Sequence, residues 1–459
     1  MKDFSKIRQL VAVIITIAEL AGFDAIAQTP QSLPRISISD FEYQGAFRLP
    51  ADDFGESNLN YSQGPIAFNP ASNSIFIVGH TYDQAIAEFN IPAIVKSSTL
   101  TDLNMCDAPI QNFTSVLDSI SGGNPQGIDR IGGIALISGP NGDELLVNGY
   151  EYYDAAADNS HTSFVIRDSS ALNSSSIDGF FSFQGGAGHT TGWISEIPLA
   201  WQDLLGGSHI TGDSSGIPII GRTSVGPSAF SFSPLDVVGK STQSGTIQTN
   251  TLLDFSLEHP LSSDLSNDSG TNDLWTHLSR AIFGFIVPGT RTYATIGFSG
   301  GHSSGVCYKC TQNDNNLCGG YCAPDAEDYS HYYWLWDLND LLKVKQGTIE
   351  SYEVTPYEYG EFPTPFTTQE LGGGAFDADS GKLYLTVQRA DTEQGQYANP
   401  PVVVVYKIGT TSSALEKIGR VGKRKFFCLK SDQSNQVKLQ RAGKADKLVD
   451  PKKAIKMIR

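Results

Sequence analysis

The sequence predicts an all-β protein, built as a single β-propeller of about seven blades (six to eight) with one or two short connecting helices. Gly, Pro, Tyr and Phe number 46, 22, 18 and 24 among 459 residues, a balance typical of many short strands joined by turns. A hydrophobic share of 40% is ample for a core. One hairpin-like pattern recurs through residues 36–410, which we expect to form the propeller.

The recurring pattern is a small residue, an apolar strand, a turn rich in Asn, Asp, Ser or Gly, and a second apolar strand. It is clearest in residues 64–79, 132–149 and 372–387, with weaker copies at 226–234 and 281–297. These turn residues tolerate positive φ, so each pair of strands is expected to fold back as a hairpin. Nearly continuous apolar runs suit strands buried on both faces, as the inner strands of stacked blades are. A pair of β-sandwiches is the main alternative, but it explains the recurrence less well.

The blade number follows from the length of this body. Repeats of four strands usually take about 40–50 residues, so residues 36–410 have room for about seven. Two segments carry helical signals instead. Apolar residues recur at helical spacing in 336–345 and Gly347 follows them, while 198–206 begins with Pro and ends with Gly. We expect both to be short helices between strands.

The first 27 residues have the pattern of a signal peptide. Lys2, Lys6 and Arg8 precede the apolar run 10–18, and Ala-Ile-Ala at 25–27 matches a cleavage site. The run is shorter than the roughly 20 residues that cross a bilayer. An uncleaved anchor or a buried strand is the alternative. The sequence therefore predicts a secreted or periplasmic protein with no transmembrane segment.

Charge divides the chain into an acidic body and a basic tail, residues 411–459. The net charge is −17, yet Lys and Arg outnumber Asp and Glu by 14 to 4 in residues 416–459. An acidic body argues against nucleic acid as a partner, and against anionic polysaccharide held by bulk charge alone. We expect the tail to be a solvated or mobile terminus outside the main fold. Contact with an anionic surface is the alternative.

Several stretches of the body carry a family resemblance. They are Phe-Glu-Tyr-Gln-Gly-Ala-Phe-Arg-Leu-Pro at 41–50, residues 67–70 with 75–80, residues 201–207, and residues 336–347. In this order they resemble a group of uncharacterised exported bacterial proteins that are propeller-like. The resemblance spans about residues 40–407 and excludes the tail. It implies the fold and a bacterial, extracytoplasmic setting, and it supplies no activity.

Four cysteines fall in one polar, glycine-rich loop, at Cys307, Cys310, Cys318 and Cys322. Four thiols at such spacing can bind Zn²⁺ tetrahedrally, but in an exported chain they more often pair as disulfides. The surrounding residues offer no core, so covalent cross-links would have a structural role there. We predict two local disulfides, with the connectivity open and a metal as the alternative.

Histidine, tyrosine and arginine residues gather where the predicted strands end. In a propeller such ends meet on one face around the channel, where ligands bind. A His base, a Tyr acid and an Arg that neutralises a carboxylate would suit β-elimination from a uronic-acid sugar. The predicted catalytic residues are His80, His161, Tyr153 and Arg222. The alternative for each is an ordinary loop or hydrogen-bonded residue.

A second predicted set binds the ligand and contains Tyr150, His302, His331 and Tyr333. Aromatic rings beside hydrogen-bond donors are surfaces on which sugar rings stack, although they also pack between blades. Residues 264–273 are dense in oxygen donors, which Ca²⁺ requires. The metal candidates are Asp264, Asp268 and Asp273. A solvated turn is the alternative, because the glycine falls one place late for an EF-hand.

These observations favour an exported propeller that binds an extracellular ligand on its channel face, with carbohydrate as the class to test first. One alternative is a polysaccharide lyase or glycan hydrolase, and another is a structural surface or matrix protein. The sequence does not decide whether the protein is an enzyme. Gly-x-Ser-x-Gly occurs at 212–216, 297–301 and 301–305, but none of the three shows the clear strand-to-helix context of a nucleophile elbow. The sequence contains no H-E-x-x-H, P-loop or dinucleotide-binding motif.

Overall fold

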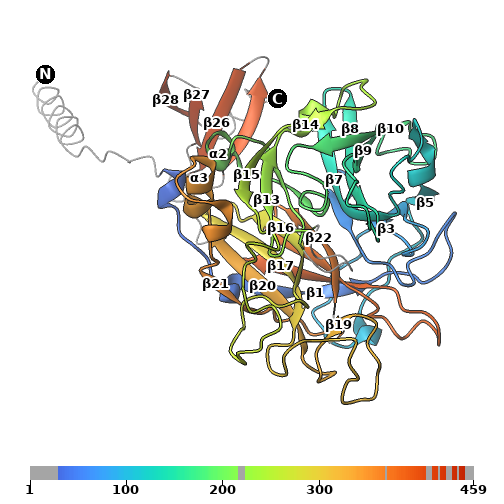
Figure 1. Cartoon of the computed structure of the whole chain (residues 1–459). Helices are drawn as coiled ribbons and strands as arrows, with labels where there is room; N and C mark the ends of the chain where they lie inside the picture. The colour runs from blue at the N-terminus through green and yellow to red at the C-terminus, as the bar shows by residue number, and fades with distance from the viewer. Residues whose placement is uncertain are drawn as a thin grey trace, which may run out of the picture.

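A computed structural model describes residues 29–214, 223–366, 368 and 370–409, and the backbone of four further strands within residues 416–449. The predicted signal peptide and Arg222 lie outside these residues. Five four-stranded antiparallel sheets, one of them extended by two short strands, are arranged as the blades of a propeller (Figure 1). No helix in the described part is long and apolar enough to cross a membrane.

Each blade is ordered from its inner strand outward. Blade 1 contains β2 (Ile66–Asn69), β3 (Ser74–Val78), β4 (Ala85–Asn90) and β5 (Gln111–Ser115). Blade 2 contains β7 (Arg130–Gly139), β8 (Gly142–Tyr150), β9 (Ser163–Ile166) and β10 (Ile177–Phe183), and short strands β6 (Ile120–Ser121) and β14 (Thr246–Ile247) pair with β10. Blade 3 contains β11 (Ile194–Glu196), β12 (His209–Thr211), β13 (Ala229–Phe232) and β15 (Thr249–Leu253).

Blade 4 contains β16 (Arg280–Ile286), β17 (Thr292–Gly300), β20 (Tyr329–Asp337) and β21 (Glu358–Glu361), and its long loop carries the pair β18 (Cys307–Tyr308) and β19 (Tyr321–Cys322). Blade 5 contains β22 (Leu371–Asp377), β23 (Lys382–Val387), β24 (Val402–Ile408) and, as its outer strand, β1 (Phe41–Arg48). The first strand of the body thus completes the last blade. Its register on β24 runs from Phe41 opposite Ile408 to Arg48 opposite Val402.

The inner strands close into a ring. β2 contacts β7 and β22, β11 contacts β7 and β16, and β16 also contacts β22. This ring confirms the propeller, but the prediction of about seven blades is wrong, because the described residues form five. Loops such as 254–279 and 301–328 add length without adding strands to the blades, and loop 301–328 holds only the short separate pair β18 and β19. The weak repeat at 226–234 is β13, the third strand of its blade, whereas the inner strand β11 is too short to show the pattern.

Both predicted helices are confirmed and are the two α-helices of the described residues, α2 (Leu199–Leu205) and α3 (Leu338–Lys345). Asp337 caps α3 by accepting a hydrogen bond from the Asn339 backbone amide. Gly206 ends α2 at a φ of 78°, a conformation in which glycine is favoured. Short 3₁₀ helices are Pro30–Ser32, Ile38–Asp40, Leu100–Asp102, Leu117–Ser119, Pro234–Asp236 and Ser351–Glu353.

The predicted tail region contains four strands, β25 (Glu416–Val421), β26 (Arg424–Lys430), β27 (Val437–Arg441) and β28 (Lys444–Val449). They pair in chain order as an antiparallel sheet that shares no strand with the blades.

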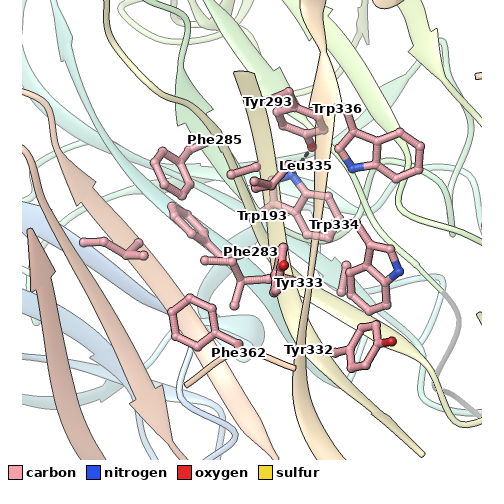
Figure 2. Packing of buried hydrophobic residues seen from close by; sticks show 14 of the residues in the cluster. Trp193, Phe283, Phe285, Tyr293, Tyr332, Tyr333, Trp334, Leu335, Trp336 and Phe362 are labelled. Atoms are coloured by element: carbon pink, nitrogen blue, oxygen red, sulfur yellow. Dashed lines mark hydrogen bonds between the residues drawn. The ribbon is translucent and has the colours of Figure 1, made fainter. Parts of the chain in front are cut away.

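Aromatic residues form the packing between blades 3, 4 and 5. Trp334, Trp336 and Tyr293 are fully buried and lie close to Trp193 (Figure 2). Their polar atoms are satisfied, since Trp193 Nε1 donates to Tyr293 Oη over 3.0 Å and Trp336 Nε1 donates to Thr295 Oγ1 over 3.0 Å. The run of aromatic residues in β20 is therefore mainly core, because both faces of this strand are covered by neighbouring blades.

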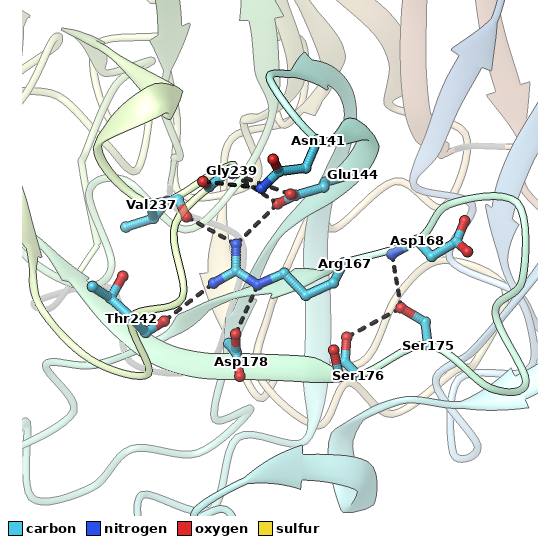
Figure 3. A network of polar contacts seen from close by, with 10 residues as sticks. All are labelled: Asn141, Glu144, Arg167, Asp168, Ser175, Ser176, Asp178, Val237, Gly239 and Thr242. Atoms are coloured by element: carbon cyan, nitrogen blue, oxygen red, sulfur yellow. Dashed lines mark hydrogen bonds and ion pairs between the residues drawn. The ribbon is translucent and has the colours of Figure 1, made fainter.

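Arg167 holds blade 2 to the connection between β13 and β14. Its guanidinium donates to Glu144 Oε2 over 2.9 Å and to Asp178 Oδ2 over 2.8 Å, and it also binds the carbonyl oxygens of Val237 and Thr242 (Figure 3). These contacts lie at the opposite end of β8 from Tyr150. Arg167 thus has a structural function on the face of the propeller opposite Tyr150.

A buried ion pair fixes the end of β1. Arg48 Nε donates to Asp391 Oδ2 over 2.7 Å and Nη2 donates to Oδ1 over 2.9 Å, while the Asp391 side chain is fully buried. Gln394 Nε2 donates both to Asp391 Oδ2 and to the Leu49 carbonyl oxygen, each over 2.7 Å. The closing strand is therefore locked to the loop that follows β23.

We expect Arg48→Met to lower the free energy of unfolding by about 3–5 kcal/mol, because it leaves the Asp391 carboxylate buried without its partner. The matched control is Lys96→Met, which removes an exposed ion pair of 3.6 Å to Glu42 on the same strand and should cost less than about 1 kcal/mol. Urea unfolding followed by tryptophan fluorescence measures both. Equal losses for the two variants would contradict a closing function for Arg48.

Candidate functional site

The loops before the inner strands, and those between the second and third strands, lie on one face of the ring, which we call the hub face. The inner strands begin side by side there. A Cβ atom at Gly132 would lie 2.1 Å from the Thr191 carbonyl oxygen, and one at Gly372 would lie 2.1 Å from that of Gln63. Glycine at these two positions lets neighbouring blades approach closely at the hub.

A cavity of about 30 Å³ opens at the centre of the hub face, with room for one or two water molecules. One polar side chain from each blade, or from the loop before it, lines this cavity. In blade order they are Gln63, Tyr150, Asp213, Arg280 and Gln388. Apolar lining comes from residues such as Trp193 and Ile131.

Arg280 is the first residue of β16 and is the cationic group of the cavity. It is partly exposed and forms no ion pair within 4.0 Å to any residue that the structure describes. Burial acts to lower the pKa of Arg280, but the neighbouring Tyr150, Asp213 and Glu370 side chains raise it above its usual value. The guanidinium therefore remains charged and can donate to an anion.

Asp213 is the acidic group of the cavity. Its Oδ2 accepts from Thr191 Oγ1 over 2.5 Å and its Oδ1 accepts from the Ser214 backbone amide over 2.7 Å. Burial raises the pKa of Asp213 above its usual value, although the hydrogen bond from Thr191 and the charge of Arg280 act in the opposite direction. Asp213 thus keeps a proton to higher pH than an exposed aspartate does.

A histidine supports Asp213 from outside the cavity. His189 Nδ1 lies 2.6 Å from Asp254 Oδ1, and positive charge on this histidine lowers the pKa of Asp213. Ser228 Oγ donates to the His189 carbonyl oxygen over 2.6 Å and accepts from the Asp213 backbone amide over 2.7 Å. The position of Asp213 is therefore fixed by several polar contacts.

The predicted catalytic residues do not meet in this cavity. His80 lies on the hub face between Tyr61 and Tyr82. His161 is exposed, with Nδ1 2.9 Å from Ser160 Oγ, and Tyr153 is 58% exposed. None of the three lines the cavity, and Arg222 lies outside the described residues.

Of the predicted ligand-binding set, only Tyr150 lines the cavity. His302 stacks on Tyr332 with ring centroids 5.0 Å apart, and its Nε2 lies 2.7 Å from Ser299 Oγ. Burial lowers the pKa of His331 to about 4. Tyr333 is buried and donates to Glu358 Oε1 over 3.1 Å. These three residues pack within blade 4.

The predicted calcium ligands do not converge. Asp264 accepts from the backbone amides of Asp268 and Ser269 over 2.8 and 3.1 Å, whereas Asp273 accepts from Tyr359 Oη over 3.1 Å. Among the described residues, Asp264, Asp268 and Asp273 do not place their carboxylate oxygens within 4.8 Å of one another.

Two local disulfides are confirmed, and they join Cys307 to Cys310 and Cys318 to Cys322. The two pairs lie in contact, since Cys310 Sγ and Cys322 Sγ are 3.3 Å apart. The cross-linked loop belongs to the hub face, because it connects β17 to β20.

Sequence reasoning missed four of the five polar residues of the cavity. Arg280 precedes the apolar run of β16 and Gln388 follows that of β23, so both occupy strand ends that the hairpin pattern marks. Asp213 lies in Gly-Asp-Ser-Ser-Gly at 212–216, a pattern that draws attention to its serine and not to its acid. Gln63 directly precedes the first repeat and carries no other signal.

No model of a known protein family matches the sequence, and no curated protein sequence matches it. Among solved structures, the chain is similar to the GH32 β-fructofuranosidase BmSUC1 of Bombyx mori, with a TM-score of 0.37, 8% identity, and coverage of 90% of this chain and 81% of that chain. It is also similar to a fructosyltransferase from A. japonicus, with a TM-score of 0.36, 9% identity, and coverage of 93% and 71%.

A third similar structure is hydrazine synthase of Kuenenia stuttgartiensis, with a TM-score of 0.29, 12% identity and coverage of 83% of both chains. The assignment of the fold rests on the sheet order and on the ring of inner strands. Together, fold and site define a five-bladed β-propeller with a polar cavity at its hub.

Cleavage after Lys309, Leu317 and Tyr321 places the four loop cysteines on four separate peptides. We expect mass spectrometry of unreduced protein, alkylated in denaturant, to find the Cys307 peptide joined to the Cys310 peptide and the Cys318 peptide joined to the Cys322 peptide. Reduction before alkylation is the control and should separate all four. Free loop thiols, or a Cys307 to Cys322 cross-link, would contradict this pairing.

Proposed function

We propose that this protein is an exported carbohydrate-binding propeller whose hub cavity binds the carboxylate of a uronic-acid sugar. The observation that carries the proposal is the position of Arg280, a cation without an ion pair within 4.0 Å among the described residues, in a cavity to which each blade contributes a polar group. Export is supported by the signal-like first 27 residues, and the two disulfides suit an oxidising compartment.

The cavity chemistry suits an acidic sugar. A guanidinium binds a carboxylate through parallel hydrogen bonds, while the amides of Gln63 and Gln388 and the phenol of Tyr150 can both donate to and accept from hydroxyl groups. About 30 Å³ accommodates a substituent and not a whole sugar ring. The ring would therefore rest at the mouth of the cavity with its carboxylate directed inward.

An anionic ligand must be recognised through short-range contacts, because the body of the protein is acidic. The whole chain carries −17 despite its basic tail, so long-range attraction cannot collect an anionic ligand. Arg280 would supply the attraction at short range, where salt screens it less than it screens exposed charges.

An enzyme acting at the same cavity is the second candidate. Asp213 has a raised pKa and lines the same cavity as Tyr150 and Arg280, a combination of acid, phenol and cation that fits general acid–base chemistry on a glycosidic bond. This assignment replaces His80, His161 and Tyr153 with residues that line the cavity. Shortened chains after incubation with a polyuronate would distinguish a lyase or hydrolase from a binding protein.

We expect calorimetry to show tighter binding of glucuronate, galacturonate or mannuronate than of the matching neutral sugar, because only the acids have a carboxylate for Arg280. Arg280→Gln should weaken binding of the preferred acid by at least about tenfold and remove the preference. Lys240→Gln removes an exposed positive charge on the opposite face and should change nothing. Equal affinity of wild-type protein for acid and neutral sugars would refute the proposal.

Binding of the acid should strengthen as the pH falls through the raised pKa of Asp213. A bound carboxylate beside Asp213 favours its protonated form, so binding takes up a proton. Asp213→Asn should lose this pH dependence and bind more tightly than wild type at pH values above the pKa of Asp213. Calorimetry in buffers of different ionisation enthalpy measures the proton uptake, and uptake that persists in the variant would assign it to another group.

A further inference from the structure

Tyrosines are prominent among the exposed large side chains of the described residues. Tyr82 and Tyr397 are each 80% exposed and Tyr61 is 49% exposed. His80 lies between two of them, with its ring centroid 5.7 Å from that of Tyr61 and 5.5 Å from that of Tyr82. We call Tyr61, His80, Tyr82 and Tyr397 the rim patch.

The rim patch is built on three loops, and the two that carry Tyr61 and Tyr397 are tied to each other. The Tyr61 backbone amide donates to Asn399 Oδ1 over 2.9 Å, and the Asn399 amide donates to Asn60 Oδ1 over 3.0 Å. Gln394 adds a further link, since its Oε1 accepts from the Ala51 amide over 2.8 Å. The loop with Tyr397 is thus held against the loop with Tyr61.

The patch adjoins the hub cavity. Gln63, which lines the cavity, is two residues beyond Tyr61, and Gln388, which also lines it, opens the loop that carries Tyr397. His80 is held beside these residues by a backbone bridge to Ser62. The exposed rings therefore lie on the hub face, over the junction of blades 5 and 1.

The composition of the patch favours a sugar as its occupant. Aromatic rings offer faces to the C–H surfaces of sugars, and the side-chain amide of the adjacent Asn399 can donate to hydroxyl groups. The large exposed aliphatic residues of the described chain (Ile110, Leu235, Leu257 and Leu317) lie elsewhere. A protein-binding patch would have a more apolar centre.

We infer that the rim patch is a second carbohydrate subsite, which holds further residues of an oligosaccharide whose acidic residue occupies the hub cavity. This inference rests on the proposed function and extends it by naming the ligand class as a uronic-acid oligosaccharide or polysaccharide. His80, predicted from sequence to be a catalytic base, becomes a stacking residue between two tyrosines.

The test uses calorimetry with galacturonate, glucuronate and mannuronate as single residues and as oligomers of increasing length. Affinity of the wild-type protein should rise by about tenfold or more from the single residue to the longer oligomers, the equivalent of roughly 1.4 kcal/mol. Tyr82→Ala combined with Tyr397→Ala should abolish this rise and leave binding of the single residue unchanged. The matched pair of Tyr→Phe changes keeps the rings and should retain the rise.

Tyr352→Ala is the aromatic control, since this exposed ring stacks on His259 away from the patch, and it should behave as wild type. If the single residue binds but affinity does not depend on length, the rim subsite is refuted and the hub site stands. If the Ala variants weaken the single residue and the oligomers equally, the patch is not a separate subsite. If no uronate of any length binds, both the proposed uronate site in the hub cavity and the rim subsite are refuted.

Discussion

The pairing of β1 with β24 is the interaction on which the rest of the structure depends. It makes blade 5 from both ends of the body, so the propeller is closed by backbone hydrogen bonds within blade 5 as well as by packing between blades. Without it β24 would be an open, apolar edge, which invites pairing with other chains. The buried Arg48–Asp391 pair then couples this closure to the loop that carries Tyr397. The same contacts therefore close the propeller and position a loop of the hub face.

Crowding at the hub explains the shape of the cavity. The inner strands begin so close together that glycine is required where they meet, as at Gly132 and Gly372. Little side-chain volume from the inner strands can enter the centre, so most polar groups come from the loops or from the ends of second strands, as Tyr150 does. The cavity is therefore small and polar, and the larger contacts with a ligand must lie on the surrounding loops.

Much of the fold, but little of the site, can be predicted from the sequence. Hairpins, inner strands and both α-helices follow from local periodicity and from turn residues, which act over a few positions. The blade number cannot be predicted in this way, because loop 301–328 is about half as long as a blade and contributes only the two-residue strands β18 and β19, which join no blade. The site residues are harder still to predict from the sequence, since Gln63 and Arg280 become neighbours only when the ring of blades closes. The histidines are predicted because of their chemical type, whereas the residues of the cavity are determined by where the fold places them.

Loop length is distributed unevenly between the two faces, and this asymmetry connects fold to function. Strand β20 begins at the disulfide-bonded loop of the hub face and ends at α3 on the other face (Figure 1). The first connection within a blade is as short as residues 140–141 on that other face, whereas residues 254–279 and 301–328 extend the hub face. Binding residues are disproportionately carried by loops on a rigid scaffold. The two longest connections therefore extend one surface, the hub face. Its two disulfides and the hydrogen bonds between its loops limit the conformational entropy that this surface would lose on binding a ligand.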